Sequence, residues 1–364
     1  MARYRDAISI PMAPSVSVLI DTYNHERFIE EAVVSVLEQD FPAAEREIIV
    51  VDDGSMDGTP EVLRKFGSQI RVLRKTNGGQ ASAFNAGIPE CQGEIVFFLD
   101  GDDWWAAGKL RAVMESFGAD HTIGLVGHGI TEVLRDRTER KHVLREPSRF
   151  RLDSAAAARE FRLRKGLLGT SRMAYRAPVL RKIGRVPETL IIQADEYLFT
   201  LAGLFSDVVI RREPLTYYRL HEANAFQITS GGEGALRKKS LVLKALAGEL
   251  QKIFEREHVA REITETVVTA VQVESEMIRL EIENGFPWET IPTEWVNYRI
   301  THEEASLLRR FLKGVSLLPA LVLPSRAYFR FRKRVTTNSV YRQARMRWLP
   351  FSQDHLEGNT AERP

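Results

Sequence analysis

Cysteine is almost absent from this chain, because Cys91 is the only one among 364 residues. A single cysteine excludes an internal disulfide framework and any cysteine-rich zinc site, and it agrees with a reducing compartment. We interpret Cys91 as a small buried residue near the end of a helix.

A strong charge of one sign and long apolar runs are also lacking. Lys and Arg exceed Asp and Glu by only two, so the charge gives no reason to expect nucleic acid as a partner. No segment approaches the roughly 20 apolar residues that cross a bilayer. The N-terminal residues lack the apolar core and cleavage site of a secretory signal. We therefore expect a cytoplasmic protein, for which contact with a membrane surface stays open.

From Ser15 to Leu99, short apolar runs alternate with longer amphipathic stretches. The runs VSVLI, EIIVV and EIVFFL are rich in β-branched and aromatic residues, and the stretch between the first two has helical spacing. This alternation predicts parallel strands covered on both faces by helices, which is an α/β fold. The ligands of such sheets bind beyond the carboxyl ends of the strands.

The rest of the chain shows two other patterns. Residues 120–220 contain short apolar pieces and the helix-like sequence QADEYLFTLAGLF, and we interpret them as a second half of the same domain. Beyond about Gly231 the apolar residues have helical spacing, which predicts a separate helical appendage. The final residues predict a frayed tail.

Three acidic residues, Asp100, Asp102 and Asp103, follow the run EIVFFL. Carboxylates this close repel one another unless a cation or solvent compensates their charge. Mg²⁺ and Mn²⁺ prefer oxygen ligands and often bind carboxylates together with substrate phosphates. The alternative is a solvated acidic turn that caps a helix starting near Lys109. The motif alone favours neither.

A second acidic turn, VVDDGSMDGTP, ends the run EIIVV. Asp53 and Ser55 could simply form a turn and cap the next helix, because such turns are common. A role in turns and helix caps can explain one acidic turn. It explains less easily why two acidic turns follow parallel strands of the same sheet. One turn could face the base and ribose of a nucleotide, and the other could face a metal ion and pyrophosphate.

The sequences SVLIDTYNHERFIEEAVVSVLEQ, IIVVDDGSMDGT, KTNGGQASAFNAGI and FFLDGDD occur in this order along the chain. Together they resemble the family 2 glycosyltransferases, which have the GT-A nucleotide-sugar fold, over about residues 14–225. The resemblance implies a mixed, mainly parallel sheet flanked by helices. It also implies transfer of a sugar from a nucleotide-diphosphate donor with inversion at the anomeric carbon, using Mn²⁺ or Mg²⁺.

The resemblance assigns the donor site to these motifs. Asp21 and Tyr23 match positions that line the base pocket, and Asp53 matches a carboxylate that accepts a hydrogen bond from the base. Uracil, thymine and guanine all offer such a donor, so the base stays open. Three more positions match a loop of the family in which small residues let the backbone approach the donor: Asn77, Gly79 and Asn85. The alternative is an ordinary glycine turn at the start of a helix.

The resemblance also supplies a metal site. Asp100 and Asp102 match the DxD signature, for which contacts to the donor ribose and to the metal are expected, and Asp103 could share the metal. The resemblance does not decide between Asp102 and Asp103 as the direct ligand, and His221 could complete the coordination.

His221 belongs to YYRLHEAN, which resembles a YRxHxxN element through Tyr218, Arg219, His221 and Asn224. Arg219 and His221 could instead stabilise the departing diphosphate. An ordinary surface or core role is the alternative for both.

Sugar transfer also needs a base, because a hydroxyl is a poor nucleophile until its proton is removed. Asp195 precedes an apolar helix where the family has its catalytic carboxylate, in a D-x-x-L pattern ending at Leu198. We expect Asp195 to be the base, with Glu196 as the second candidate. Asp195 could also act as a helix N-cap, and both roles can coexist.

Two further pairs of residues are candidates near the donor sugar. Gly169 and Thr170 lie in a stretch that shapes the acceptor side in the related enzymes, and they could approach the sugar. Trp104 and Trp105 could stack on a sugar or pack beneath the acidic turn, and for one of them packing is at least an equal alternative.

The segment FLKGVSLLPALVLPSRAYFRFRKRV joins an apolar run to a cluster of cations: Arg326, Arg330, Arg332, Lys333 and Arg334. Apolar and aromatic side chains beside clustered cations suit the interface of an anionic membrane. An ordinary helix with a solvated basic edge is the equal alternative. Membrane contact would suit a lipid-linked acceptor.

These features divide the chain into an arm (1–13), a catalytic domain (14–228), a helical region (229–350) that could contact the membrane, and a tail (351–364). The catalytic domain has a nucleotide-sugar half (14–119) and an acceptor half (120–228). We expect a cytoplasmic inverting glycosyltransferase with a glycan or lipid-linked glycan acceptor, for which peripheral contact with the inner face of the cell membrane stays open. The alternatives are a non-catalytic nucleotide-sugar binder and a nucleotidyltransferase. A nucleotidyltransferase usually has a glycine-rich, basic phosphate loop after its first strand, and this chain has DTYNHERF at that position.

Overall fold

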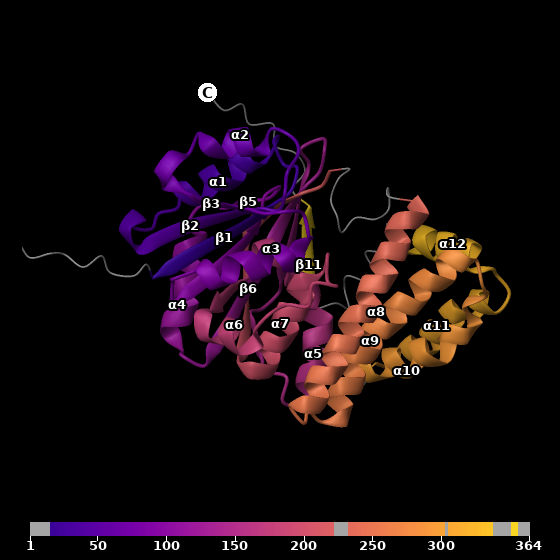
Figure 1. Cartoon of the computed structure of the whole chain (residues 1–364). Helices are drawn as coiled ribbons and strands as arrows, with labels where there is room; N and C mark the ends of the chain where they lie inside the picture. Colours follow the sequence, from indigo (N-terminus) through magenta and orange to yellow (C-terminus); the bar gives the residue numbers. More distant parts are fainter. Residues whose placement is uncertain (1–14, 222–231, 303–304, 338–350, 356–364) are drawn as a thin grey trace, which may run out of the picture.

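A computed structural model describes residues 15–221, 232–302, 305–337 and 351–355 (Figure 1). At its centre is a mixed sheet flanked by helices, with further helices on one side. The strands are β1 (Val16–Thr22), β2 (Arg46–Asp52), β3 (Arg71–Arg74), β4 (Ile95–Asp100), β5 (Trp104–Trp105), β6 (Ile123–Val133), β7 (Glu139–Leu144), β8 (Ser148–Phe150), β9 (Ala174–Arg176), β10 (Asp207–Arg219) and β11 (Phe351–His355).

The helices before strand β10 cover the sheet, and the later ones form the C-terminal region. They are α1 (Ile29–Leu37), α2 (Thr59–Arg64), α3 (Gln80–Gly87), α4 (Lys109–Ala119), α5 (Ala155–Arg164), α6 (Ala177–Ile183), α7 (Ala194–Phe205), α8 (Gly232–Arg256), α9 (Arg261–Glu283), α10 (Ile291–Thr301), α11 (Leu307–Leu317) and α12 (Ser325–Thr337).

The N-terminal part of the sheet is parallel, as the alternation of runs predicts. Strands β3, β2, β1 and β4 lie side by side in this order, and Asp21 of β1 is opposite Asp100 of β4. Strand β9 then pairs antiparallel with both β4 and β6, while β10 runs parallel to β6. The mixed sheet confirms the expected fold class.

Successive residues of the central strands point to opposite faces, as the two-residue period of a strand requires. In β4, Val96 and Phe98 join a core with α3 and α7, whereas Phe97 and Leu99 join a second core with α1 and α4. Because both faces are covered, the strands are apolar throughout and polar residues are confined to their ends.

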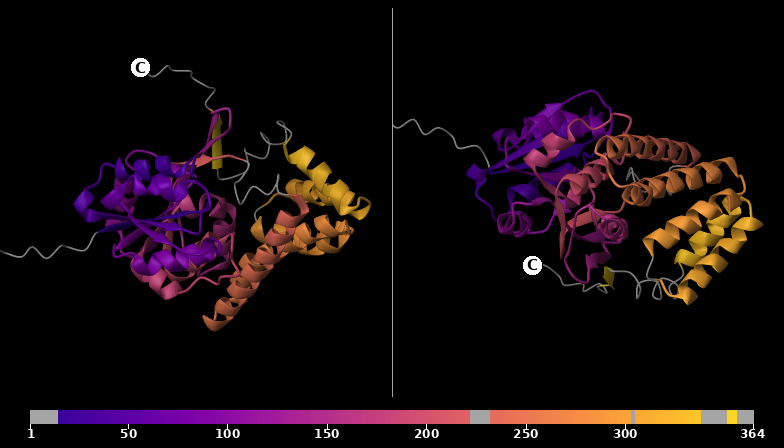
Figure 2. Two further views of the ribbon diagram at one scale, coloured as in Figure 1. Left: turned by 45° about the horizontal axis from the view of Figure 1, so that its top comes forward. Right: turned by 90° about the horizontal axis from the view of Figure 1, so that it is seen from below.

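The helical region is not wholly separate from the sheet. Leu246 and Leu250 of α8 and Val267 of α9 belong to the same buried core as Phe98 of β4. Helices α8 and α9 therefore lie against the part of the chain that contains the sheet, and α10, α11 and α12 lie on their other side (Figures 1 and 2). The chain thus has the expected C-terminal helices, and the apolar faces of α8 and α9 complete the core beside the sheet.

The expected tail begins with a paired strand, since β11 (Phe351–His355) runs antiparallel to β7. Such pairing was not visible in the sequence, because it depends on a strand some two hundred positions earlier. Among the described residues, every helix is too short or too polar to cross a bilayer.

Candidate functional site

The carboxyl ends of β1, β2 and β4 bring acidic residues to one edge of the sheet, as the rule for parallel sheets predicts. The main group is Asp100, Asp102 and Asp103, whose ligand oxygens all lie within 4.8 Å of one another. Asp21 lies beside them on β1, opposite Asp100 in the strand register. This spacing allows one cation to contact several carboxylates.

Backbone and hydroxyl donors orient the acidic cluster. Ser171 Oγ accepts a hydrogen bond from the Asp100 N–H at 3.0 Å and donates to Asp100 Oδ2 at 3.3 Å. Asp103 is 1% exposed, and its Oδ1 accepts from the Arg219 N–H at 3.0 Å. Asp103 Oδ2 is buried and accepts no hydrogen bond from any residue that the structure describes.

Burial and the charges of neighbouring carboxylates raise the pKa values of Asp21, Asp100 and Asp103. Burial, followed by the charge of Asp102, raises the pKa of Asp21 and of Asp103 to about 8. Burial and the charge of Asp21 raise the pKa of Asp100 well above its ordinary value. A divalent cation would compensate this repulsion, and the oxygen donors are those that Mn²⁺ and Mg²⁺ prefer. The residues therefore fit such a metal.

Two histidines flank Asp102. His221 Nε2 lies 2.9 Å from Asp102 Oδ2, and His25 Nε2 lies 3.9 Å from the same oxygen. Burial tends to raise the pKa of Asp102, but the hydrogen bond from His221 holds it below the ordinary value. The structure thus brings the expected residue His221 to the cluster, together with His25, which the sequence analysis missed.

Arg219 closes one side of the cluster. Its Nε donates to the Asp102 carbonyl at 3.0 Å, and its guanidinium forms an ion pair with Glu31. The Arg219 Cζ lies over the rings of Phe28 and Trp104, at 4.9 and 4.4 Å from their centroids. These contacts hold a cation at the rim of the acidic cluster.

The two tryptophans have different surroundings. Trp105 is 3% exposed within the core, so packing is the alternative that its surroundings favour. Trp104 is partly exposed and stacks on Tyr217 with ring centroids 5.0 Å apart. Trp104 is therefore the one whose surroundings suit contact with a ligand.

Asp53 is buried and bound to the loop before α3. Its carboxylate accepts from the Gly79 N–H at 2.7 Å and the Gly78 N–H at 3.1 Å, and it pairs with Lys75 Nζ at 2.6 Å. Asn77 Nδ2 donates to the Asp53 carbonyl at 3.0 Å. Most of the hydrogen bonds that the Asp53 carboxylate can accept thus come from this loop and hold its shape.

Gly79 and Asn85 contact the segment before α7. An added Cβ at Gly79 would lie 2.7 Å from the Ile191 carbonyl oxygen, so its close approach is to this segment. The Asn85 side chain exchanges two hydrogen bonds of 2.8 Å with the backbone of Val186. The structure therefore does not bring the Asn85 amide to the acidic cluster.

Asp195 lies in the first turn of α7, close to the acidic cluster. Its Oδ2 accepts from the Thr170 N–H at 3.3 Å, and its Oδ1 accepts from the Glu196 N–H at 2.8 Å. Burial, followed by the charge of Glu196, raises the pKa of Asp195 above its ordinary value. The charge of Asp195 in turn contributes to the raised pKa values of Asp21 and Asp100.

Glu196 has a different environment. Its carboxylate forms an ion pair with Lys165, and Gln193 Nε2 lies 3.5 Å from its other oxygen. The ion pair restrains the Glu196 carboxylate and occupies one of its two oxygens. The geometry therefore favours Asp195 over Glu196 as a proton acceptor.

Several residues of the site were not anticipated. Gln80 Oε1 accepts from the Ala194 N–H and its Nε2 donates to Thr170 Oγ1, both at 2.9 Å. Buried Lys109 donates to the Ser171 carbonyl at 2.7 Å. Arg172 lies near enough to the acidic side chains to affect their pKa values. The NGGQ motif contains Gln80 and could have indicated it.

The other predicted residues lie at the edges of the site or outside the described part. Tyr23 is 42% exposed, as a stacking surface would be. Tyr218 is partly buried, and this burial, followed by the charges of Asp103 and Asp102, raises its pKa. Asn224 and the arm before Ser15 lie outside the described residues.

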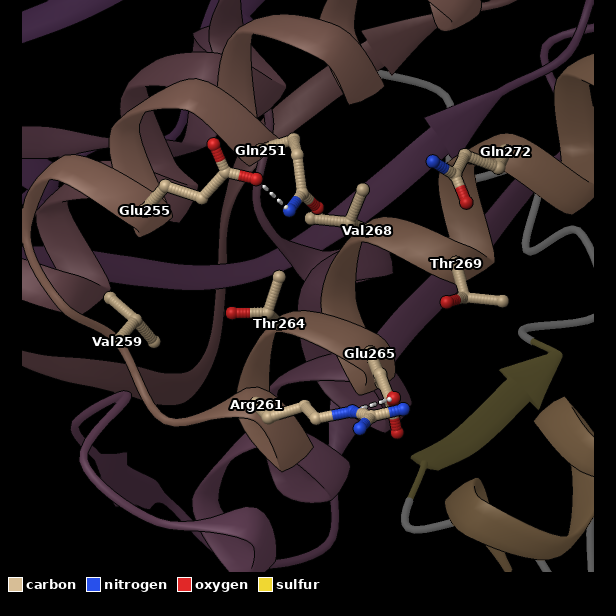
Figure 3. A pocket seen from close by; sticks show the side chains of 9 residues that line it. All are labelled: Gln251, Glu255, Val259, Arg261, Thr264, Glu265, Val268, Thr269 and Gln272. Carbon is tan, nitrogen blue, oxygen red and sulfur yellow. Dashed lines mark hydrogen bonds and ion pairs between the residues drawn. The ribbon is translucent and has the colours of Figure 1, made fainter.

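A hollow of about 330 Å³ lies elsewhere, between α8 and α9 (Figure 3). Its lining includes Gln251, Glu255 and Gln272, and an ion pair joins Arg261 to Glu265 at its rim. None of the predicted site residues contributes to it. The hollow is therefore distinct from the acidic edge of the sheet.

A comparison with protein families identifies the N-terminal part of the chain. A model described as glycosyl transferase family 2 matches residues 17–184. The chain contains a glycosyl transferase family 2 domain. An uncharacterized glycosyltransferase of Nostoc sp., alr2836, is 33% identical over 214 residues, which are 57% of this chain and 66% of that protein. The chain therefore matches only part of the length of this relative.

Solved structures confirm the fold around the family 2 domain. The crystal structure of TarS 1–349 from S. aureus covers 79% of this chain and 80% of its own, with 21% identity and a TM-score of 0.53. The mannosyltransferase PcManGT from Pyrobaculum calidifontis, in complex with GDP-Man and Mn²⁺, covers 91% of this chain and 83% of its own. Its identity is 19% and its TM-score 0.51, so this likeness concerns the fold.

Proposed function

We propose that this chain is an inverting glycosyltransferase. It moves a sugar from a nucleotide-diphosphate donor to the hydroxyl of a glycan or lipid-linked glycan, in the synthesis of a cell-surface polysaccharide or glycolipid. The family 2 domain supports the reaction class. The working site of such an enzyme is the cytoplasmic face of the cell membrane, where nucleotide sugars are available.

One observation carries the proposal. Two consecutive residues of the turn η5 (Thr170–Arg172) connect the proposed base to the acidic cluster, because Thr170 contacts Asp195 and Ser171 contacts Asp100. A base and a leaving-group site held by one short turn keep a fixed separation. Such preorganisation is what a displacement between two bound substrates requires.

The proposed reaction is a single in-line displacement. The acceptor oxygen forms a bond to the anomeric carbon as the bond from this carbon to the diphosphate oxygen breaks, which inverts the configuration. Asp195 takes the acceptor proton. A raised pKa suits this role, because a more basic carboxylate accepts the proton more readily.

Residues of the acidic cluster would hold the metal. Asp102 and Asp103 are the proposed ligands of Mn²⁺ or Mg²⁺, with His221 beside Asp102. The cation would compensate the negative charge that develops on the leaving diphosphate. The fold neighbour PcManGT is in complex with GDP-Man and Mn²⁺, which supports a metal and a nucleotide sugar as ligands of this fold.

The donor site is proposed to extend from the cluster along the strand ends. Asp21 and Tyr23 would line the base pocket, and Arg219 would face the diphosphate. Asp53 would either accept a hydrogen bond from the nucleotide base or shape the nucleotide site through the loop before α3, which its carboxylate binds. The remaining proposed donor residues are Asn77, Gly79, Asn85 and Asp100.

The test is the variant Asp195→Asn, assayed with donor, acceptor and Mn²⁺. Removing a general base costs about 100- to 10,000-fold in rate, while donor-induced thermal stabilisation should stay nearly unchanged. Glu196→Gln is the control, and it should retain most of the activity. Full turnover by Asp195→Asn would exclude Asp195, and loss confined to Glu196→Gln would identify Glu196 as the base.

A panel of nucleotide diphosphates and their sugars, with and without Mn²⁺, tests the donor. Stabilisation by donors without any product from the panel of acceptors would support a nucleotide-sugar binder instead. Stabilisation by none of them in either condition would contradict the proposed function.

A further inference from the structure

Helix α11 exposes its apolar face. Leu307, Leu308, Phe311, Leu312 and Val315 recur at helical spacing on one side of the helix, and all five are exposed. A helix of a globular protein normally buries this stripe against the core and turns its polar side to solvent. Here the arrangement is reversed.

The opposite side of α11 is the one that packs on the protein. Leu317 is buried, and Lys313 Nζ forms an ion pair of 2.5 Å with Glu294 of α10, which is 7% exposed. Lys313 also lies 5.6 Å from the centre of the Tyr298 ring. These contacts fix the rotation of the helix, so its apolar side faces outward.

The exposed apolar surface continues beyond the end of the helix. Leu318 and Leu321 of the turn η7 (Leu318–Leu321), and the next residue Val322, are all more than half exposed. We call these eight side chains the α11 face. The surface lies in the group of helices on the side of α8 and α9 away from the sheet (Figure 2).

The segment of the chain that carries the α11 face is rich in cations. Residues 305–337 contain eight Lys or Arg and neither Asp nor Glu, although the whole chain has a formal charge of only +2. On α12, Arg326, Arg330 and Arg334 recur every four residues and are exposed, and Phe331 is exposed beside them. An apolar surface within a cationic segment is complementary to a partner that is both apolar and anionic.

We propose that the α11 face binds the surface of an anionic lipid bilayer. Its apolar side chains enter the boundary between headgroups and acyl chains, while the nearby arginines contact lipid phosphates. A second copy of the chain fits less well, because two cationic segments would repel each other. The inference concerns a partner of the protein and does not depend on the transfer reaction.

The experiment measures co-sedimentation of the full chain with vesicles of phosphatidylcholine mixed with phosphatidylglycerol, and with vesicles of phosphatidylcholine alone. We expect binding to the anionic vesicles that weakens with added salt. Leu308→Ser with Phe311→Ser should weaken it about tenfold or more, because each side chain is 66% exposed and contributes apolar area. Leu241→Ser on α8, at a position that is 68% exposed, is the matched control and should bind normally.

The thermal unfolding midpoint and donor binding of each variant are measured in parallel, so that loss of folding is distinguished from loss of lipid contact. Equal binding by the double variant and the wild type would overturn the proposal. A concentration-dependent dimer that Phe311→Ser abolishes, without any vesicle binding, would assign the α11 face to a second copy. Vesicle binding by a protein without transferase activity would leave this inference standing and remove only the proposed function.

Discussion

Asp195 and Glu196 are neighbours in the chain, but their carboxylates lie in different electrostatic surroundings. Lys165 holds the Glu196 carboxylate in an ion pair, whereas the Asp195 carboxylate accepts hydrogen bonds from the backbone N–H groups of Thr170 and Glu196. The charge of Glu196 contributes to the raised pKa of Asp195. The negative charge of Glu196 therefore makes the Asp195 carboxylate a stronger proton acceptor.

This difference predicts the pH dependence of transfer. A base must be deprotonated to act, so the rate should rise with pH and fall as the pH drops through the pKa of Asp195. Because burial raises this pKa, the acid limb should lie above the ordinary value of 3.8. Glu196→Gln removes a neighbouring negative charge and should move the limb to lower pH. A pH–rate profile of kcat/KM measures both, and a limb that moves upward in Glu196→Gln would contradict the electrostatic coupling.

Gly79 is a second residue whose surroundings lead to a prediction. Its φ of 82° belongs to the region that favours glycine, and an added Cβ would lie 2.7 Å from the Ile191 oxygen. Gly79→Ala should lower the free energy of unfolding by about 3 kcal/mol or more, since strain and a backbone clash combine. Urea denaturation measures this loss.

Gly184 provides the matched control. Its φ of 77° is similar, but an added Cβ would meet no atom within 4 Å. Gly184→Ala should therefore cost only the backbone strain, about 1–2 kcal/mol. Equal losses in the two variants would show that contact with Ile191 contributes nothing.

The sequence predicted those parts of the site that lie close together along the chain. Asp100, Asp102 and Asp103 follow one buried strand, so their proximity needs no knowledge of the tertiary fold. Ser171 contacts Asp100 from 71 positions away, and its motif indicates no such contact. His25 was missed for the same reason, because its approach to Asp102 depends on how β1 and β4 pair.

At the scale of elements, Gln80 connects three parts of the site. It begins α3, its side chain accepts from the first N–H of α7 at Ala194, and it donates to Thr170 of η5. The first N–H groups of a helix have no partner within the helix, so Gln80 satisfies one that would otherwise need another acceptor. Through these contacts it fixes the turn that carries Asp195.

The variant Gln80→Ala should reduce kcat about tenfold to a hundredfold, because a small misplacement of a base has effects of this order. Its KM for the donor should change little. Gln80→Glu keeps the acceptor for Ala194 but cannot donate to Thr170 when ionised, and it should recover part of the loss. Exposed Gln92→Ala is the control, and steady-state kinetics would disprove the positioning role if kcat stayed at the wild-type value.

The sequence predicted the long buried strands but not the short strand β9. The apolar runs VSVLI, EIIVV and EIVFFL became β1, β2 and β4, because a strand buried on both faces must be apolar throughout. Strand β9 has only three residues, Ala174–Arg176, and runs antiparallel between β4 and β6. A segment this short has no detectable period, so its pairing is decided by tertiary contacts.

At the scale of the whole molecule, the C-terminal helices have two different relations to the sheet. Helices α8 and α9 complete the core that contains Phe98 of β4. Helix α11 leaves an apolar surface exposed and is held by the ion pair of Lys313 with Glu294. The first pair of helices contributes to the stability of the family 2 domain, and α11 offers a surface for a partner.

The shared core predicts that the sheet and α8 unfold together. Leu250 is 0% exposed in the core cluster with β4, so Leu250→Ala should lower the free energy of unfolding by about 2–5 kcal/mol. Leu241→Ala, on the exposed side of the same helix, should change it by less than about 0.5 kcal/mol.

Native-state hydrogen exchange measures where the loss occurs. If the two parts form one cooperative unit, the most protected amides of β4 should exchange about 30-fold faster or more in Leu250→Ala, because their exchange then requires global unfolding. Protection lost in α8 but kept in β4 would instead show that the helices unfold on their own.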